Sequence, residues 1–256
     1  MIIIKTPAEI EKIKAACAIT AEVFDQVAPY IKPGVSTWEL DQVVYQTIVQ
    51  KGARPSFLHY GDPPFPGSAC ISVNEEVVHG IPSKKRILQE GDIVSVDVGA
   101  YLDGFHSDAA RTFLCGQVDP AVEKLVRVTE EAFWLGIGQA QLGKRIGDIS
   151  HAIQEHCESQ GFGIVRELSG HGLGRNLHED PEILNYGPAG KGPRLQVGMV
   201  LAIEPMVTLG SPRIAIEDDD WTIVTRDGKA AAHYENTIVI SEDGPEVLTC
   251  PERRRL

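Results

Sequence analysis

GDIVSVDVGAYLDGFHSDAAR, residues 91–111, is the stretch that decides the fold. Its apolar, β-branched run Ile93–Val98 predicts a buried strand. The dipeptide Asp103-Gly104 favours a two-residue hairpin turn. The stretch therefore predicts a strand, a tight turn and a returning strand, with one acid on each side of the turn.

These two acids, Asp97 and Asp108, are predicted to lie on one face of the hairpin. With the turn at residues 103 and 104, Asp97 lies opposite Ala110 and Asp108 opposite Gly99. The two acids are then diagonal neighbours, roughly 7–8 Å apart at the backbone. In a buried sheet their carboxylates would repel unless a cation lay between them, which predicts a metal site. The alternative that this stretch leaves open is an edge hairpin with one solvated face.

Composition predicts a soluble globular protein. The chain has 256 residues and 43% apolar content, enough for one large domain or two closely packed halves. A formal charge of −12 argues against DNA as a partner, because the basic runs at 84–86 and 253–255 are too short to form a phosphate-binding face. Five cysteines, never spaced as C-x-x-C, predict neither a disulfide framework nor a cysteine zinc site. The sequence has no export signal and no membrane-spanning run, so the expected compartment is the cytoplasm.

Helix start and stop signals recur along the chain. Capping boxes at Thr6–Glu9 and Ser36–Glu39, and the pair Asp119-Pro120, predict the beginnings of three helices, and a fourth is predicted to end at Gly161. Residues 54–68 are rich in proline and aromatic residues. They predict a loop of the kind that lines a pocket.

An internal repeat divides the chain into two halves, approximately residues 30–115 and 140–245, within one predicted domain of residues 1–256. At an offset of 109, the first half's Gly34, Leu40, Val44, Ile48 and Gly52 recur as Gly143, Ile149, Ile153, Cys157 and Gly161. Each half then reaches a strand in which an acid follows a glycine by six residues.

The acid in the second half is Glu204, and Glu235 lies on the predicted returning strand. If the halves pack about a pseudo-twofold axis, four carboxylates converge. Such a cluster needs about two divalent cations to neutralise it.

Histidines supply the remaining candidate ligands. His171 lies between glycines in Gly170–Gly174, where we expect a loop that turns tightly and leaves the imidazole accessible. His178 and His79 are further candidates. A site with four carboxylates and one imidazole suits Mn, Fe or Co at least as well as Zn.

These motifs together resemble type I methionine aminopeptidase over nearly the whole chain. The residues that carry the resemblance are Asn74–Pro82, Asp97 with Asp108, Gly170–Pro181, Ile203–Met206 and Tyr234–Thr237. Only 33 residues separate His171 from Glu204, which leaves no room for the large insertion of type II enzymes. The resemblance implies the bacterial type, with no N-terminal extension.

The resemblance implies an α/β pita-bread fold, in which two pseudo-symmetric halves surround a dinuclear metal centre. Carried over by position, Asp97 would bind one metal, His171 and Glu204 the other, and Asp108 and Glu235 would bridge them. The two divalent ions could be Co, Mn, Fe(II), Zn or Ni.

The implied reaction is removal of the N-terminal methionine from nascent proteins and peptides, with a small second residue favoured. A metal-bridging hydroxide would attack the first peptide carbonyl, and Glu204 would shuttle its proton. His178 would stabilise the oxyanion, and His79 would contact the scissile amide nitrogen or help to protonate the departing amine.

The resemblance also implies an apolar methionine pocket that includes Phe65, Cys70, Leu177 and Trp221. Leu177 replaces the phenylalanine usual in this family, and residues 60–67 differ from the common form of their loop. We hypothesise a roomier pocket. The family default is a monomer, and docking near the exit tunnel of the ribosome is an expectation that the residues themselves do not address.

Two other functions remain as alternatives. A prolidase or X-Pro aminopeptidase uses the same fold, but usually with a sizeable extra N-terminal domain for which there is no room before residue 54. A non-catalytic binding module would have lost metal ligands, whereas all five positions are intact here.

Overall fold

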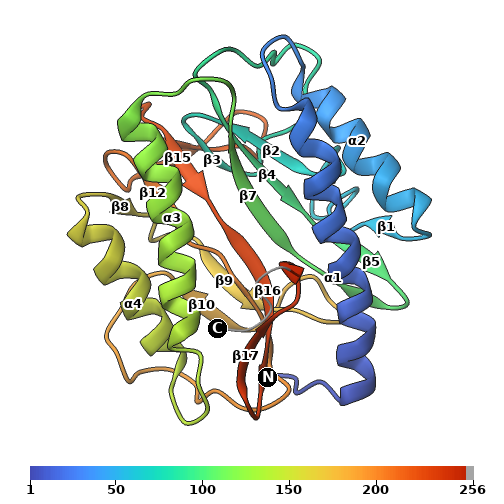
Figure 1. The fold of residues 1–256 in the computed structure, drawn as a ribbon, viewed down its shortest axis with the longest axis vertical. Helices are drawn as coiled ribbons and strands as arrows, with labels where there is room; N and C mark the ends of the chain where they lie inside the picture. The colour runs from blue at the N-terminus through green and yellow to red at the C-terminus, as the bar shows by residue number, and fades with distance from the viewer. Residues whose placement is uncertain (252–256) are drawn as a thin grey trace.

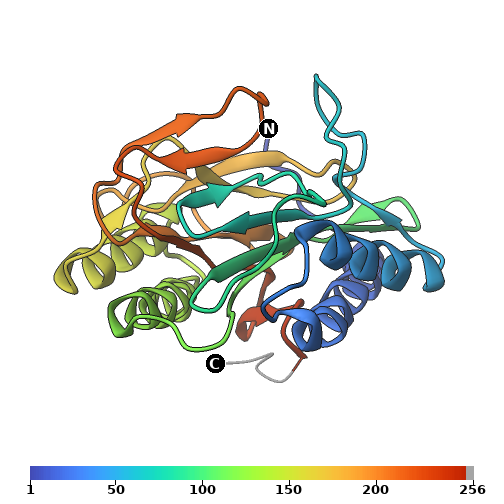
Figure 2. The same ribbon diagram turned by 90° about the horizontal axis from the view of Figure 1, so that it is seen from above.

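The computed structural model describes residues 1–251, so the basic run at 253–255 lies outside them (Figures 1 and 2). Four α-helices line one face of a large sheet, while the loop after residue 55 rises from the opposite face (Figure 2). The helices are α1 Pro7–Val27, α2 Thr37–Gln50, α3 Pro120–Gly138 and α4 Ile146–Ser159, with a 3-10 turn at Ala28–Tyr30. Within residues 1–251, no helix is long and apolar enough to cross a membrane.

Seventeen strands complete the described chain. They are β1 Arg54–Pro55, β2 Cys70–Val73, β3 Glu76–Val78, β4 Ile93–Val98, β5 Ala100–Leu102, β6 Phe105–His106, β7 Ala109–Leu114, β8 Gly163–Ile164, β9 Ser169–Gly172, β10 Glu179–Leu184, β11 Val200–Ile203, β12 Met206–Thr208, β13 Ile214–Ile216, β14 Ile223–Thr225, β15 Ala231–His233, β16 Glu235–Ser241 and β17 Gly244–Val247. The large sheet runs β10-β9-β11-β16-β7-β4-β2, with β17 beside β16, and three small sheets flank it.

The predicted helix starts are confirmed. Thr6 and Ser36 each cap a helix by accepting a hydrogen bond from the backbone of the glutamate three residues later. Asp119 caps α3 with proline at the first helical position, and α4 ends two residues before Gly161.

The repeat at an offset of 109 has a structural counterpart. Helices α2 and α4 begin and end at that offset, and both capping residues, Ser36 and Arg145, take part in isolated bridges, to Ile87 and Arg194 respectively. The repeated glycines also share a conformation, because Gly34 and Gly143 have φ of 91° and 84°. The same local geometry is thus built twice.

The predicted hairpin register is confirmed. Asp97 pairs with Ala110, and the turn dipeptide Asp103-Gly104 has positive φ at both residues, as a primed turn requires. The outer part of the hairpin, β5 and β6, leaves the large sheet and pairs with β1. The inner part, β4 and β7, stays in the large sheet and carries Asp97.

A single row of paired residues brings acids from both halves together. Across β2, β4, β7 and β16 the row reads Cys70, Asp97, Ala110, Glu235. Directly paired residues lie on the same face of a sheet, so the small Ala110 leaves space between two carboxylates. The halves join at this row, where β7 pairs with β16.

Two apolar clusters hold the helices against the sheet. One packs α3 and α4 under β11 and β16, and the other packs α1 and α2 under β2 and β4. Because these clusters fill the helix side of the sheet, the face that carries Asp97 and Glu235 is left for a polar site.

Candidate metal centre and substrate pocket

One cavity of about 250 Å³ is lined by every site residue that the sequence predicted. These are His79, Asp97, Asp108, His171, His178, Glu204 and Glu235, with Phe65, Cys70, Leu177 and Trp221. Two further lining residues, Phe57 and Tyr60, come from the predicted pocket loop but were not singled out. The cavity thus joins an acidic floor to an apolar wall.

The floor holds carboxylates that have been removed from water. Asp108 and Glu235 are only 4% and 2% exposed. Asp97 Oδ1, Asp108 Oδ1 and Glu235 Oε1 have no hydrogen-bond partner within residues 1–251. A buried charged oxygen without a partner is costly, so this floor fits bound cations better than it fits the protein alone.

Burial dominates the electrostatics of the floor. It raises the pKa of Asp97 to about 7. It also raises the pKa of Asp108 and Glu235 well above their ordinary values, and neighbouring carboxylates raise them further. Burial raises the pKa of Glu204 in the same way. Without cations, these groups hold protons that a divalent ion would displace.

We expect the melting temperature of chelator-treated wild type, measured relative to that of chelated Asp97→Asn, to fall as the pH rises from 5 to 8. The buried histidines, whose lowered pKa values act in the opposite direction, are common to both proteins. A carboxyl group whose pKa is raised in the folded protein stabilises the fold fully at pH values below its unfolded pKa, which is 3.8 for aspartate. For Asp97 this stabilisation is lost as the pH rises through about 7. A fall of at least about 5 °C is expected from shifts of this size. Thermal melts with chelator across this range test it.

The matched control for these melts is Asp97→Asn, which should flatten the pH dependence because one of the raised groups is gone. A difference between the two melting temperatures that stays constant or grows from pH 5 to pH 8 would contradict the expectation.

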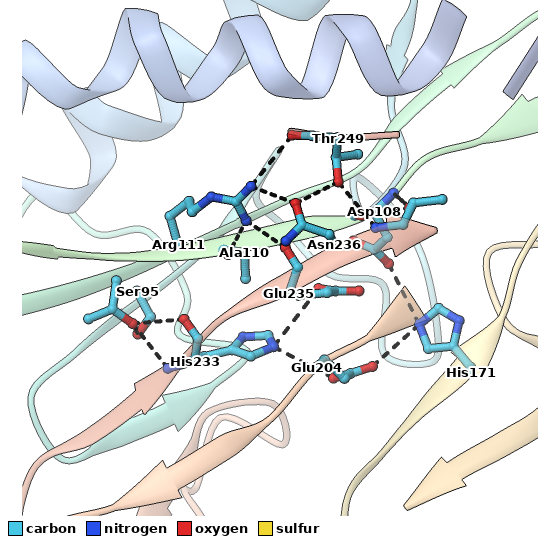
Figure 3. A network of polar contacts seen from close by, with 12 residues as sticks. Ser95, Asp108, Ala110, Arg111, His171, Glu204, His233, Glu235, Asn236 and Thr249 are labelled. Carbon is cyan, nitrogen blue, oxygen red and sulfur yellow. Dashed lines mark hydrogen bonds and ion pairs between the residues drawn. The ribbon is translucent and has the colours of Figure 1, made fainter. Parts of the chain in front are cut away.

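His171 is prepared as a metal ligand through its tautomer. Its Nδ1 lies 2.9 Å from the carbonyl oxygen of Gly172, which only accepts, so Nδ1–H donates and Nε2 keeps a free lone pair. Nε2 lies 3.7 Å from Asp108 Oδ2 and 3.6 Å from Glu204 Oε1 (Figure 3). Burial lowers the pKa of His171 to about 3, which keeps the ring neutral.

Three of these residues already have the spacing of a metal site. One ligand atom each from Asp108, His171 and Glu235 lies within 4.8 Å of the other two. The donor set of carboxylate oxygens and one imidazole nitrogen suits a divalent cation. The residues present therefore fit such an ion.

The expectation of a loop around His171 is wrong. Ser169–Gly172 forms strand β9, between β10 and β11 in the large sheet. Its glycines serve close approach rather than a turn, since a Cβ at Gly170 would lie 2.4 Å from the carbonyl oxygen of Ala202, and one at Gly172 would lie 2.2 Å from that of Asp180. The strand fixes His171 more rigidly than a loop would.

His178 is held by a tyrosine that the sequence did not single out. The hydroxyl of Tyr60 lies 2.6 Å from His178 Nδ1. Burial and the charge of Asp108 raise the pKa of Tyr60, so the hydroxyl keeps its proton and can donate it to Nδ1. Nε2 of His178 then carries the hydrogen and is a donor.

The apolar wall is a small cluster of its own. Phe57, Phe65, Cys70 and Leu177 are buried together, and Trp221 packs against them. The Trp221 ring meets Phe65 edge-on at 5.2 Å, and its Nε1–H donates to the carbonyl oxygen of Pro63. This wall can receive an apolar side chain beside the acidic floor.

His79 lies at the border between the wall and the floor. Its backbone has a φ of 58°, and its ring meets Trp221 edge-on at 6.0 Å. Burial lowers its pKa to about 4, so the ring is neutral near pH 7.

Behind the floor, a polar network positions Glu235 (Figure 3). Arg111 Nη1 donates to the Glu235 carbonyl oxygen at 2.6 Å, and Nη2 donates to Asn236 Oδ1 at 2.6 Å. The guanidinium lies over the rings of both Phe24 and Tyr234. No local sequence pattern marks this contact, because its partners lie 124 residues apart.

The comparisons with known proteins agree with this geometry. The model of metallopeptidase family M24 matches residues 11–242. The chain is 52% identical over 252 residues to a methionine aminopeptidase of Clostridium acetobutylicum, which covers 98% of this chain and all of that relative. It is 51% identical over 249 residues to methionine aminopeptidase 1 of Bacillus subtilis, covering 97% of this chain and 99% of the relative.

Solved structures show the same relationship. The crystal structure of a methionine aminopeptidase from Thermotoga maritima matches with a TM-score of 0.95 and 48% identity over 98% of this chain and all of that one. A prolidase from Pyrococcus furiosus matches 98% of this chain but only 66% of its own, with a TM-score of 0.80 and 27% identity. The α/β pita-bread fold expected from the sequence is confirmed.

Proposed function

The chain belongs to metallopeptidase family M24 and, within it, to the methionine aminopeptidases, and on this premise we propose how its site removes an N-terminal methionine. The enzyme is a hydrolase acting on the N-terminal methionine of proteins and peptides. The observation that carries the mechanism is the set of buried, unpartnered carboxylate oxygens directly beside an apolar pocket.

We propose that this site would hold two divalent cations through Asp97, His171 and Glu204, together with Asp108 and Glu235. Support comes from the common cavity and from the spacing of Asp108, His171 and Glu235. When bound, the cations supply Lewis acidity and lower the pKa of a water. Co, Mn, Fe(II), Zn and Ni are all compatible with a set of oxygen and imidazole ligands.

Three side chains around the floor have separate roles in the reaction. Glu204, whose Oε1 lies 3.6 Å from His171 Nε2 and which lines the cavity, would take the proton released by the attacking water. His178 Nε2–H donates to the developing oxyanion, since Tyr60 occupies its Nδ1. His79 contacts the scissile nitrogen at the border of the pocket and assists its protonation as the amine departs.

Replacement of Tyr60 by phenylalanine is expected to lower kcat about ten-fold, because His178 loses the partner that fixes its tautomer. KM for Met-Ala-Ser and the bound metal should stay within about two-fold of wild type, since the ring remains in the pocket. Steady-state kinetics and metal analysis test both. Tyr30→Phe, at another exposed tyrosine, is the control, and an unchanged kcat in Tyr60→Phe would contradict the role.

The methionine side chain is proposed to lie against Phe65, Cys70, Leu177 and Trp221. We expect Leu177→Phe to raise the preference for Met-Ala-Ser over Leu-Ala-Ser by at least about five-fold in kcat/KM, because the larger ring fills the pocket. Leu177 is buried in this cluster, so the added volume enters the pocket itself. Competition between the two peptides measures this preference. An equal or smaller preference for Met-Ala-Ser in the variant would contradict the hypothesis of a roomier pocket.

Further proposals follow from membership of the family. We propose that residues 1–256 act as one catalytic domain containing the two repeats, that a small second residue is favoured, and that the chain is a monomer. The substrate is proposed to be the nascent polypeptide in the cytoplasm, with the ribosome as a docking partner near the exit tunnel.

The test of function is release of the first residue from Met-Ala-Ser and from Ala-Pro-Ala by chelated protein given Mn, Fe(II), Co, Ni or Zn separately. Metal-dependent cleavage of Met-Ala-Ser alone is expected. Cleavage of the proline peptide alone would favour the X-Pro enzymes, although the prolidase match covers only 66% of that longer chain. Silence on both peptides without bound metal would favour a binding module.

A further inference from the structure

His233 is a buried imidazole to which the mechanism above gives no role. It is 1% exposed, and its Nε2 has no hydrogen-bond partner within residues 1–251. Nε2 lies 3.7 Å from Glu204 Oε2 and 3.9 Å from Glu235 Oε2 (Figure 3). An unpartnered ring nitrogen directed at two carboxylates calls for an explanation.

The backbone holds His233 firmly in this place. Its backbone N–H donates to the Thr112 hydroxyl oxygen at 3.0 Å, and the same hydroxyl donates to the His233 carbonyl oxygen at 2.8 Å. Thr112 in turn lies 2.8 Å from the hydroxyl of Ser95 on the neighbouring strand. On its other side His233 pairs with Met206 in the small sheet of β15 and β12. These contacts fix the backbone of His233, and with it the place of the ring behind the floor.

Glu204 lies between two imidazoles, one at each carboxylate oxygen. His171 Nε2 is 3.6 Å from Oε1, and His233 Nε2 is 3.7 Å from Oε2 (Figure 3). His171 presents a lone pair, because its hydrogen is on Nδ1. With cations bound, Glu204 is an ionised carboxylate that only accepts, so the stable arrangement on the other side is an Nε2–H of His233 directed at Oε2.

We propose that His233 is a positioning residue that donates Nε2–H to Glu204 Oε2, which leaves Oε1 turned toward His171 and the metal. The proposal rests on the metal site of the proposed function. A movement of Glu204 by roughly 0.8 Å closes the gap to hydrogen-bond length. The bond restricts Glu204 to the orientation in which it is both a ligand and a proton acceptor.

The test compares a matched pair of variants of the full chain, His233→Leu and His233→Gln. Leucine fills similar volume without a donor, whereas the glutamine amide keeps one. Binding of Mn(II) is measured by calorimetry without substrate, and kcat and KM are then measured on Met-Ala-Ser. His233→Leu should weaken one equivalent of Mn(II) about ten-fold or more and lower kcat, with KM within about two-fold. His233→Gln should restore both to within about three-fold of wild type.

Each other outcome has a distinct meaning. Wild-type Mn(II) binding and kcat in His233→Leu would overturn the proposal. Equal loss of metal in both variants would overturn it in favour of His233 as a direct ligand. His151→Ala, at an exposed histidine of α4, controls for general effects. Wild-type protein that binds Mn(II) but is silent on Met-Ala-Ser would instead contradict the proposed function, because calorimetry alone still tests His233.

Discussion

Asp108→Ala is expected to lose metal and activity together while the protein remains folded. Asp108 is buried, and its carboxylate lies near both His171 and the other acids of the floor. Loss of one of the five proposed ligands should weaken metal binding severely, because few donors remain to hold the cations. Activity on Met-Ala-Ser should fall by at least about 10³-fold, because the water is no longer activated.

The same substitution should not destabilise the metal-free protein. The pKa of Asp108 is raised by burial and by the charges of Glu235 and Asp97, so alanine removes a carboxyl group that is costly to ionise in the interior. We expect the chelated variant to melt at or above the temperature of chelated wild type. Thermal melts, metal content and steady-state kinetics together separate loss of the site from loss of the fold.

Asp25→Ala, at an exposed aspartate of α1, is the matched control and should behave as wild type. An Asp108→Ala protein that keeps two equivalents of metal, or that keeps near-normal turnover, would remove Asp108 from the proposed centre.

The hairpin that decides the fold was predictable because its signals are local. A turn dipeptide fixes which residues face each other, and the side-chain period of a strand then fixes the face. The pairing of Asp97 with Ala110 follows from these two facts alone. The helices were predictable for the same reason, since capping residues and their partners lie three residues apart.

The surroundings of the site were not predictable in this way, because they depend on distant partners. Tyr60 and His178 are 118 residues apart, and the contact of Arg111 with Glu235 spans 124. No local pattern marks such pairs. His233 was overlooked for a related reason, since its position behind Glu204 follows only from the packing of β15 on β12.

Glycine was the ambiguous signal. The glycines beside His171 were interpreted as freedom to turn, but they allow β10 and β11 to approach β9 closely. Both uses rest on the missing Cβ, and sequence alone does not distinguish them. This placement favours the proposed role of His171, because a side chain on a paired strand is better positioned than one on a loop.

His79→Ala is expected to keep its metal and lose turnover. His79 lines the cavity and packs on Trp221, but neither it nor its contacts belong to the cluster of Asp108, His171 and Glu235. Removing a group that moves a proton or binds the reacting nitrogen typically costs about 10²–10⁴ in rate. We therefore expect kcat on Met-Ala-Ser to fall by about that factor, with Mn(II) affinity within about two-fold of wild type.

Backbone strain at this position decides the choice of control. His79 has a φ of 58°, a conformation that asparagine adopts more readily than alanine. His79→Asn therefore tests whether the rate loss comes from the side chain, and it should be as inactive as His79→Ala but at least as stable. Near-normal turnover in either variant would show that His79 has no role in the chemistry. Loss of metal in His79→Asn would show that His79 serves the metal centre and not the departing amine. Calorimetry with Mn(II), thermal melts and single-turnover kinetics on the two variants distinguish these roles, because only a role in chemistry lowers the single-turnover rate at full metal occupancy.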